Sequence, residues 1–248
     1  MSLANILYYV LSALAVLIVL TIHEYSHAYA AYKLGDNTAK NFGRLTLNPI
    51  KHIDPFGALC MLLFHFGWAK PVPINARNFK NPKRGFAITA MAGPLSNLIT
   101  AFVSALLYLL TFALLRDVEF PSEFALNLAQ NTLDFIYIFH VINVGIAVFN
   151  LLPVPPLDGS RILTVVLPPR VYFGIMKYER TIYLVLVGWL ILGGYAADFL
   201  LSSPLIASNG VLSFLASLLD LSGRLSDVFS WISKGMMAFW QLIIPFLK

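Results

Sequence analysis

Long apolar stretches separated by short polar segments dominate the chain. Four of them are long enough to cross a membrane, because about 20 apolar residues in a helix span the hydrocarbon core of a bilayer. They run from about Ile6 to Leu34, from Phe86 to Leu115, from Thr132 to Leu152 and from Thr181 to Leu201. This pattern predicts an all-α polytopic membrane protein with about four transmembrane helices.

The C-terminal part of the chain has a weaker pattern. Val211 to Leu221 carries apolar residues at helical spacing, and Met236 to Phe246 is apolar but short and is interrupted by Pro245. Such segments are typical of helices that lie on a membrane or against a helical bundle. We therefore predict a membrane-embedded core over residues 1–204 and an amphipathic, interfacial helical tail over residues 205–248.

Charge is distributed unevenly between the polar segments. Lys33 to Arg84 and Arg161 to Arg180 are basic, whereas Arg116 to Asn131, expected to form a loop, is acidic. Basic segments mark the cytoplasmic side of a membrane protein, so the N-terminus is predicted to lie outside. The apolar stretch Phe56 to Trp68 is too short for a span and lies between cytoplasmic residues. We predict that it is a re-entrant or interfacial element.

Composition agrees with a membrane protein. The chain is 58% hydrophobic and only 12% charged, which is about half the charge of an average soluble protein. The net charge of +5 follows from the topology and does not indicate nucleic acid as a partner. Cys60 is the only cysteine, which excludes an intrachain disulfide. The first apolar stretch lacks a basic N-terminal flank, so we do not interpret it as a cleaved signal peptide.

The first span ends in a His-Glu-x-x-His motif formed by His23, Glu24 and His27. Positions four apart share one face of a helix, so the two imidazoles can bind one metal ion, with Glu24 beside them as a general base. A lone histidine in an apolar helix is usually a packing residue. Ionisable side chains at membrane depth are costly, however, and are functional by default. The motif therefore predicts a zinc hydrolase site inside the membrane.

A hydrolytic zinc ion needs a third protein ligand and one open position. His52, His65 and His140 are the remaining histidines, and Asp158 is the best-placed carboxylate because it follows a proline-rich break. Asp158 could equally cap the helix that begins there. Sequence spacing does not decide between the two roles. For His52 we favour a supporting role over metal ligation.

Several motifs occur in an order seen in one known family. They are His23–His27, Asn48–Pro55, Gly93–Asn97 and Asn150–Gly159. The chain resembles the site-2 protease family of intramembrane zinc metalloproteases, and within it the compact prokaryotic branch without PDZ or CBS domains. The resemblance covers about Ile6 to Leu201. It implies that Asp158 is the third ligand of one Zn²⁺ per chain, and that Asn97 binds the substrate backbone or the developing oxyanion.

The resulting hypothesis is a multi-pass protease of a prokaryotic cell membrane. It would hydrolyse transmembrane or membrane-associated proteins near the cytoplasmic face, with the lipid bilayer as its other partner. The alternative is a non-catalytic membrane protein that binds or transports zinc. Glu24 argues against a purely structural site, which would favour four protein ligands and needs no base. A transporter would be expected to carry ionisable residues at several depths, and the later spans contain few.

Overall fold

The computed structural model describes residues 3–57, 69–203, 206 and 208–247. Four of its helices are long and apolar enough to cross a membrane: α1 (Leu3–Lys33), α4 (Pro82–Leu115), α5 (Glu123–Leu151) and α8 (Glu179–Leu201). The shorter helices are α2 (Thr38–Asn41), η1 (Pro49–Lys51), η2 (Ala76–Asn78), α6 (Asp158–Val166), α7 (Pro169–Met176), α10 (Gly210–Ser217), α11 (Leu221–Ile243) and η3 (Pro245–Leu247). The described residues contain no β-strand. The all-α polytopic membrane fold is confirmed.

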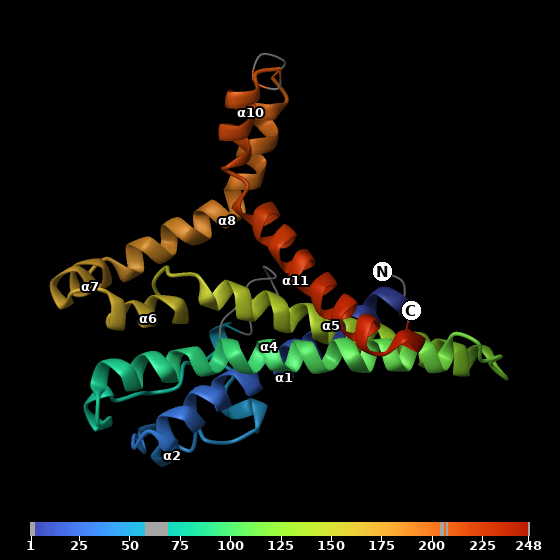
Figure 1. The fold of residues 1–248 in the computed structure, drawn as a ribbon, viewed down its shortest axis with the longest axis horizontal. Coiled ribbons are helices and arrows are strands. Elements are labelled where there is room, and N and C mark those ends of the chain that lie inside the picture. Colours follow the sequence, from blue (N-terminus) through green and yellow to red (C-terminus); the bar gives the residue numbers. More distant parts are fainter. Residues whose placement is uncertain (1–2, 58–68, 204–205, 207, 248) are drawn as a thin grey trace.

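Helices α1, α4 and α5 form the central bundle, in which α4 packs against both of the others (Figure 1). Small side chains fill their contacts, which lets the backbones approach closely, as is usual between helices in a membrane. The fully buried small side chains on these helices are Ala15, Val19, Ala31, Ala101, Ala105, Val144, Ala147 and also Ala28, which packs against Ala39 and Val72. Large apolar side chains such as Ile99 and Leu107 point outward instead. The interior of the bundle therefore consists largely of small residues, and its outer surface carries large apolar side chains that can face lipid.

Helix α5 begins earlier than the apolar pattern indicated. The segment from Arg116 to Asn131 was expected to be a loop, but the helix starts at Glu123. The Ser122 hydroxyl oxygen caps it by accepting a hydrogen bond from the Ala125 amide at 3.2 Å, and the acidic Glu123 suits a helix N-terminus. With 29 residues, α5 is roughly 44 Å long and exceeds the hydrocarbon thickness. Its polar first turns therefore extend beyond the membrane core.

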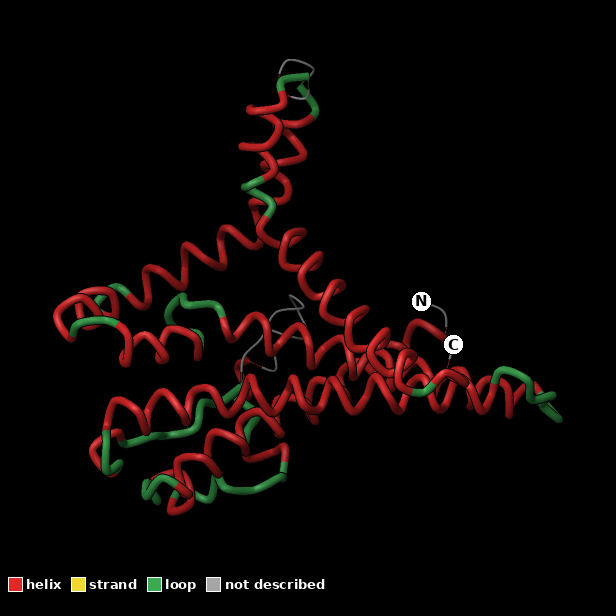
Figure 2. Tube along the Cα trace, in the orientation of Figure 1, coloured by secondary structure: helices red, strands yellow, loops and turns green. Residues whose placement is uncertain are grey.

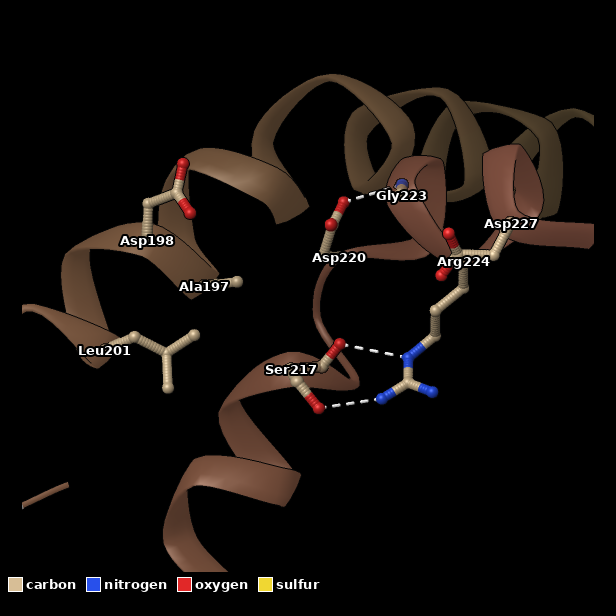
Figure 3. A pocket seen from close by; sticks show the side chains of 8 residues that line it. All are labelled: Ala197, Asp198, Leu201, Ser217, Asp220, Gly223, Arg224 and Asp227. Carbon is tan, nitrogen blue, oxygen red and sulfur yellow. Dashed lines mark hydrogen bonds between the residues drawn. The ribbon is translucent and has the colours of Figure 1, made fainter. Parts of the chain in front are cut away.

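The tail forms a hairpin and then returns to the bundle. Figure 1 shows the C-terminal part of α8 beside α10, projecting away from the central helices. The turn into α11 is fixed by Arg224, which donates to the Ser217 carbonyl at 3.0 Å and to its hydroxyl at 2.7 Å, and by Asp220, which caps α11 at Gly223 (Figure 3). These residues line a pocket between the three helices.

Helix α11 packs against α4, α5 and α8. Polar contacts connect it to the bundle: the Ser233 hydroxyl lies 2.7 Å from His140 Nε2, and the Trp240 indole donates to the Phe102 carbonyl at 2.9 Å. The helix ends at Ile243, two residues before Pro245, where the sequence predicted an interruption. The division into a core of residues 1–204 and a tail of residues 205–248 remains a prediction.

The polar segment between α1 and α4 folds back along the ends of these helices (Figure 2). Asp36 organises it by accepting hydrogen bonds from the amides of Thr38 and Asn75 and from the side chain of Asn78. Burial opposes ionisation of this carboxyl group, but the hydrogen bonds outweigh burial and hold the pKa of Asp36 below its usual value. The segment is thereby attached to the C-terminal end of α1, which carries His23 and His27.

The predicted re-entrant element, Phe56 to Trp68, lies almost entirely outside the described residues. The residues that flank it, Ile53 and Ala69, form an isolated antiparallel bridge. The chain therefore leaves and re-enters the described structure at the same place. The re-entrant assignment itself stays a prediction.

Candidate metal centre

His23 and His27 lie on one face of α1, as their spacing predicted. Their side chains are almost fully buried, and the two Nε2 atoms are 3.0 Å apart. Each Nδ1 atom has a partner on α4: His27 Nδ1 donates to the Thr89 carbonyl at 2.7 Å, and His23 Nδ1 donates to Asn97 Oδ1 at 2.5 Å. With the ring proton on Nδ1, both Nε2 atoms present a lone pair to the same point.

Asp158 completes the cluster from the first turn of α6. Its Oδ2 atom lies 3.1 Å from His23 Nε2 and 3.2 Å from His27 Nε2. Leu157, not Asp158, occupies the N-cap position, and no side chain caps this helix. The alternative role of Asp158 as a helix cap is therefore not realised. The three residues form a group able to hold a metal ion, with ligand atoms within 4.8 Å of one another.

The geometry of the cluster fits a tetrahedral cation. Two imidazole lone pairs and a carboxylate oxygen that face one another repel unless positive charge lies between them. Zinc ligands at about 2.0–2.1 Å in a tetrahedron are roughly 3.3 Å apart, close to the observed separations of 3.0, 3.1 and 3.2 Å. The Asp158 side chain retains 22% exposure, so the centre is accessible from one side. Three protein ligands with one accessible side are typical of a catalytic metal site.

Glycines allow the helices that carry the ligands to come together. A Cβ atom on Gly159 would lie 2.3 Å from the Leu151 carbonyl oxygen at the end of α5. Only glycine lets α6 start this close to α5, which places Asp158 beside the two histidines. A Cβ atom on Gly93 of α4 would lie 2.3 Å from His27 Nε2 and 2.7 Å from His23 Cε1. Gly93 therefore makes the space in which the imidazole rings meet.

We expect Gly93→Ala to weaken zinc binding by at least about tenfold, because the added methyl group displaces the ligand atoms that outer contacts otherwise hold in place. The matched control is Gly188→Ala in α8, where a Cβ atom meets nothing within 4 Å. That change should leave zinc binding intact and stabilise the helix by about 0.5–1 kcal/mol. Titration of each purified variant with zinc against a competing chelator measures the difference. Equal affinities of the two variants would contradict this assignment of Gly93.

Glu24 is held next to the cluster by an extended segment that precedes α4. Its Oε2 atom accepts a hydrogen bond from the Val72 amide at 3.1 Å. The buried Arg44 fixes this segment by donating to the carbonyl groups of Lys70 and Pro71. Glu24 is half-buried, and this hydrogen bond orients one of its carboxylate oxygens. Its role as a general base stays a prediction.

The other candidate ligands lie elsewhere. His52 donates from Nε2 to the Thr46 carbonyl at 2.8 Å, and its own carbonyl accepts from the Lys70 amide at 2.8 Å. It supports the segment that holds Glu24 and is not part of the cluster found among the described residues. His140 is buried between α4, α5 and α11, where Nδ1 donates to the Ala101 carbonyl at 2.9 Å. His65 lies outside the described residues.

Asn97 is close to the centre, where its side chain contacts His23 and helix α5. It is fully buried behind His23. Its Nδ2 atom donates to Asn143 Oδ1 at 2.9 Å and lies 3.5 Å from the Val19 carbonyl. Within the described structure, no donor of Asn97 is directed at the accessible side of the cluster. Its contact with a substrate or an oxyanion therefore has no support in this geometry.

Fold and site together define a membrane-embedded metallohydrolase. Residues 11–193 match the model of peptidase family M50, and since this range covers most of the chain, the chain belongs to that family. The resemblance to the site-2 proteases is confirmed, and the protein is an intramembrane metalloprotease.

Two curated proteins are similar to this chain. "Putative zinc metalloprotease YwhC" of Bacillus subtilis (strain 168) is 47% identical over 170 residues, which are 66% of this chain and 75% of that protein. "Putative zinc metalloprotease Rip2" of Mycolicibacterium smegmatis (strain ATCC 700084 / mc(2)155) is 28% identical over 176 residues, which are 69% of this chain and 63% of that protein. No solved structure matches.

Proposed function

We propose that this protein is a zinc endopeptidase that cleaves transmembrane or membrane-associated proteins near the cytoplasmic face of a prokaryotic cell membrane. The observation that carries the proposal is the convergence of His23, His27 and Asp158 on one point next to Glu24. The similarity to two proteins named as zinc metalloproteases supports zinc as the metal, one ion per chain.

In this proposal the three ligands hold the metal, and Glu24 moves the proton. Zinc, when bound, supplies a Lewis acid that lowers the pKa of water and polarises a carbonyl group. Glu24 accepts the proton of the attacking water and passes it to the amine that leaves. The hydrogen bond from the Val72 amide keeps the Glu24 carboxylate oriented while it gains and then loses this proton. Buried small side chains of α1 and α4 exclude lipid from the surroundings of the site.

The competing function is a non-catalytic membrane protein that binds or transports zinc. Glu24 has no use in such a protein, and the one-sided exposure of Asp158 favours a site that admits a substrate. Reconstitution in liposomes with a labelled single-span test protein separates the two. A protease releases the label at a discrete site near one membrane face. Zinc flux into the vesicles without any cleavage would favour the alternative.

The orientation of the site follows from the charge asymmetry. The loop between α4 and α5, with exposed Asp117, is expected outside, and the basic segment around Lys80 is expected in the cytoplasm. Single cysteines at Val118 and Lys80, each in a Cys60→Ser background, test this in intact cells. An impermeant thiol reagent should label only the cysteine at position 118. Labelling of the cysteine at position 80 alone would place the metal centre toward the outer face.

A further inference from the structure

Three consecutive turns of α4 form the wall against which both imidazole rings rest. Thr89, Gly93 and Asn97 are spaced four residues apart and share one face of the helix. The Thr89 backbone carbonyl accepts a hydrogen bond from His27 Nδ1, and the Asn97 side-chain oxygen accepts one from His23 Nδ1. Gly93, between them, leaves room for the two rings. His27 is therefore oriented by the main chain, and His23 by a side chain.

The orientation of Asn97 is itself determined by a second buried amide. Asn143 of α5 is fully buried, and its Nδ2 atom donates to the Phe139 carbonyl of its own helix at 2.8 Å. The Asn143 Oδ1 atom must then face Asn97, where it accepts from Asn97 Nδ2 at 2.9 Å. The Asn97 Oδ1 atom is thereby directed at His23 Nδ1, 2.5 Å away.

The relay has one direction because each amide has distinct donor and acceptor ends. The Phe139 carbonyl can only accept a hydrogen bond, which fixes the orientation of the Asn143 amide. Asn143 in turn fixes the orientation of the Asn97 amide, and the Asn97 oxygen then requires a proton on His23 Nδ1. A proton held on Nδ1 leaves Nε2 as a lone pair directed at the metal position. Groups that orient a metal-bound histidine in this way typically change metal affinity by about 10–100-fold when they are removed.

We propose that Asn97 and Asn143 form an amide relay that sets the tautomer and ring orientation of His23 for metal binding, with Asn97 as a positioning residue. The proposal rests on the proposed zinc site and changes the role expected for Asn97 from the family resemblance. It also explains why two asparagine side chains are buried at membrane depth, where polar groups require partners.

The test measures zinc affinity of the purified full-length protein by competition with a chelator. Asn97→Leu keeps the side-chain volume but removes the acceptor, and it should weaken zinc binding by about 10–100-fold. Asn97→Asp keeps an acceptor oxygen at His23 but loses the donor to Asn143 Oδ1, whose orientation the Phe139 carbonyl fixes. This variant should weaken zinc binding less than Asn97→Leu does. Asn143→Ala, which only loosens Asn97, should likewise lie between the parent and Asn97→Leu.

The matched control is Thr100→Ala on the same helix, whose hydroxyl donates only to the Ser96 carbonyl within α4. It should bind zinc like the parent. The visible absorption spectrum of the Co²⁺-loaded protein gives a second readout, since a reoriented His23 alters the ligand field. The spectrum should change in Asn97→Leu but not in Thr100→Ala.

Parent-like zinc affinity and an unchanged Co²⁺ spectrum in Asn97→Leu would overturn the relay. If that variant also cleaved slowly, Asn97 would act on the substrate, as the resemblance implied. Should Asn97→Leu not fold, parent-like affinity in Asn143→Ala would contradict the relay equally well. A His23→Ala variant that binds zinc like the parent would instead overturn the proposed function, so the two failures are distinguishable.

Discussion

Replacing Glu24 with glutamine is expected to slow peptide hydrolysis by about a hundred- to ten-thousandfold while zinc stays bound, because general-base catalysis typically contributes that factor. Glutamine has nearly the same shape as glutamate, and its side-chain oxygen can still accept the hydrogen bond from the Val72 amide that Glu24 Oε2 accepts at 3.1 Å. The helix and the cluster should therefore persist. Only the ability to take a proton is lost.

Two quantities are measured on the same preparation: zinc per chain by atomic absorption, and cleavage of a single-span test protein in liposomes. Tyr25→Phe, which changes the next residue of α1 without removing a carboxylate, serves as the control and should retain most of the activity. Parental cleavage rates in Glu24→Gln would show that this carboxylate is not the base. Loss of zinc from the variant would show that Glu24 has a structural role at the metal.

Removing a carboxylate from the cluster should have a comparably large effect on the metal. We expect Asp158→Ala to lower zinc affinity by more than about 100-fold, since loss of a direct ligand exceeds the loss of an outer-shell contact. The Asp158 Oδ2 atom lies 3.1 and 3.2 Å from the two imidazole Nε2 atoms, so its removal would leave two of the three proposed ligands. Cleavage should fall with zinc occupancy.

Asp158→Asn separates charge from shape, because the amide retains the volume but is a poor zinc ligand. It should behave like Asp158→Ala. Asp117→Ala, at an exposed carboxylate of the loop between α4 and α5, is the control and should match the parent. Stoichiometric zinc in Asp158→Ala at parental affinity would remove Asp158 from the ligand set and reopen the search for a third ligand.

The metal-bearing helix could be predicted because its information is local. His23 and His27 are four residues apart, and helical geometry alone brings them to one face. The position of Asp158 could not be derived in that way. Its place depends on the tight approach of α6 to α5 at Gly159, where a Cβ atom would lie 2.3 Å from a backbone oxygen. The spacing of residues along the sequence does not reveal that contact.

The contacts of Asn97 and Arg44 could not be predicted for the same reason. Asn97 belongs to a motif of the family, but its hydrogen bonds to His23 and Asn143 join three different helices. Arg44 lies in the basic range Lys33 to Arg84, and nothing in the sequence indicated that it fixes the segment that holds Glu24. The amide side chain of Asn97 on a largely apolar span was an available hint of such a role.

Helix boundaries show where hydropathy fails. The spans that end near Leu115 and Leu201 were predicted to within a residue, since apolar composition stops there. The start of α5 was misplaced because polar residues between Glu123 and Asn131 are helical outside the membrane core. Hydropathy reports where the lipid is, whereas capping by Ser122 determines where the helix begins.

The central claim is that a single zinc ion, held by His23, His27 and Asp158, is required for proteolysis. The most direct test is removal and return of the metal in the parent protein, with cleavage of the single-span test protein in liposomes as the readout. The account predicts that chelator-stripped protein does not cleave, and that activity rises in proportion to added Zn²⁺ until one ion is bound per chain. Cleavage at the parental rate by the stripped protein would contradict it.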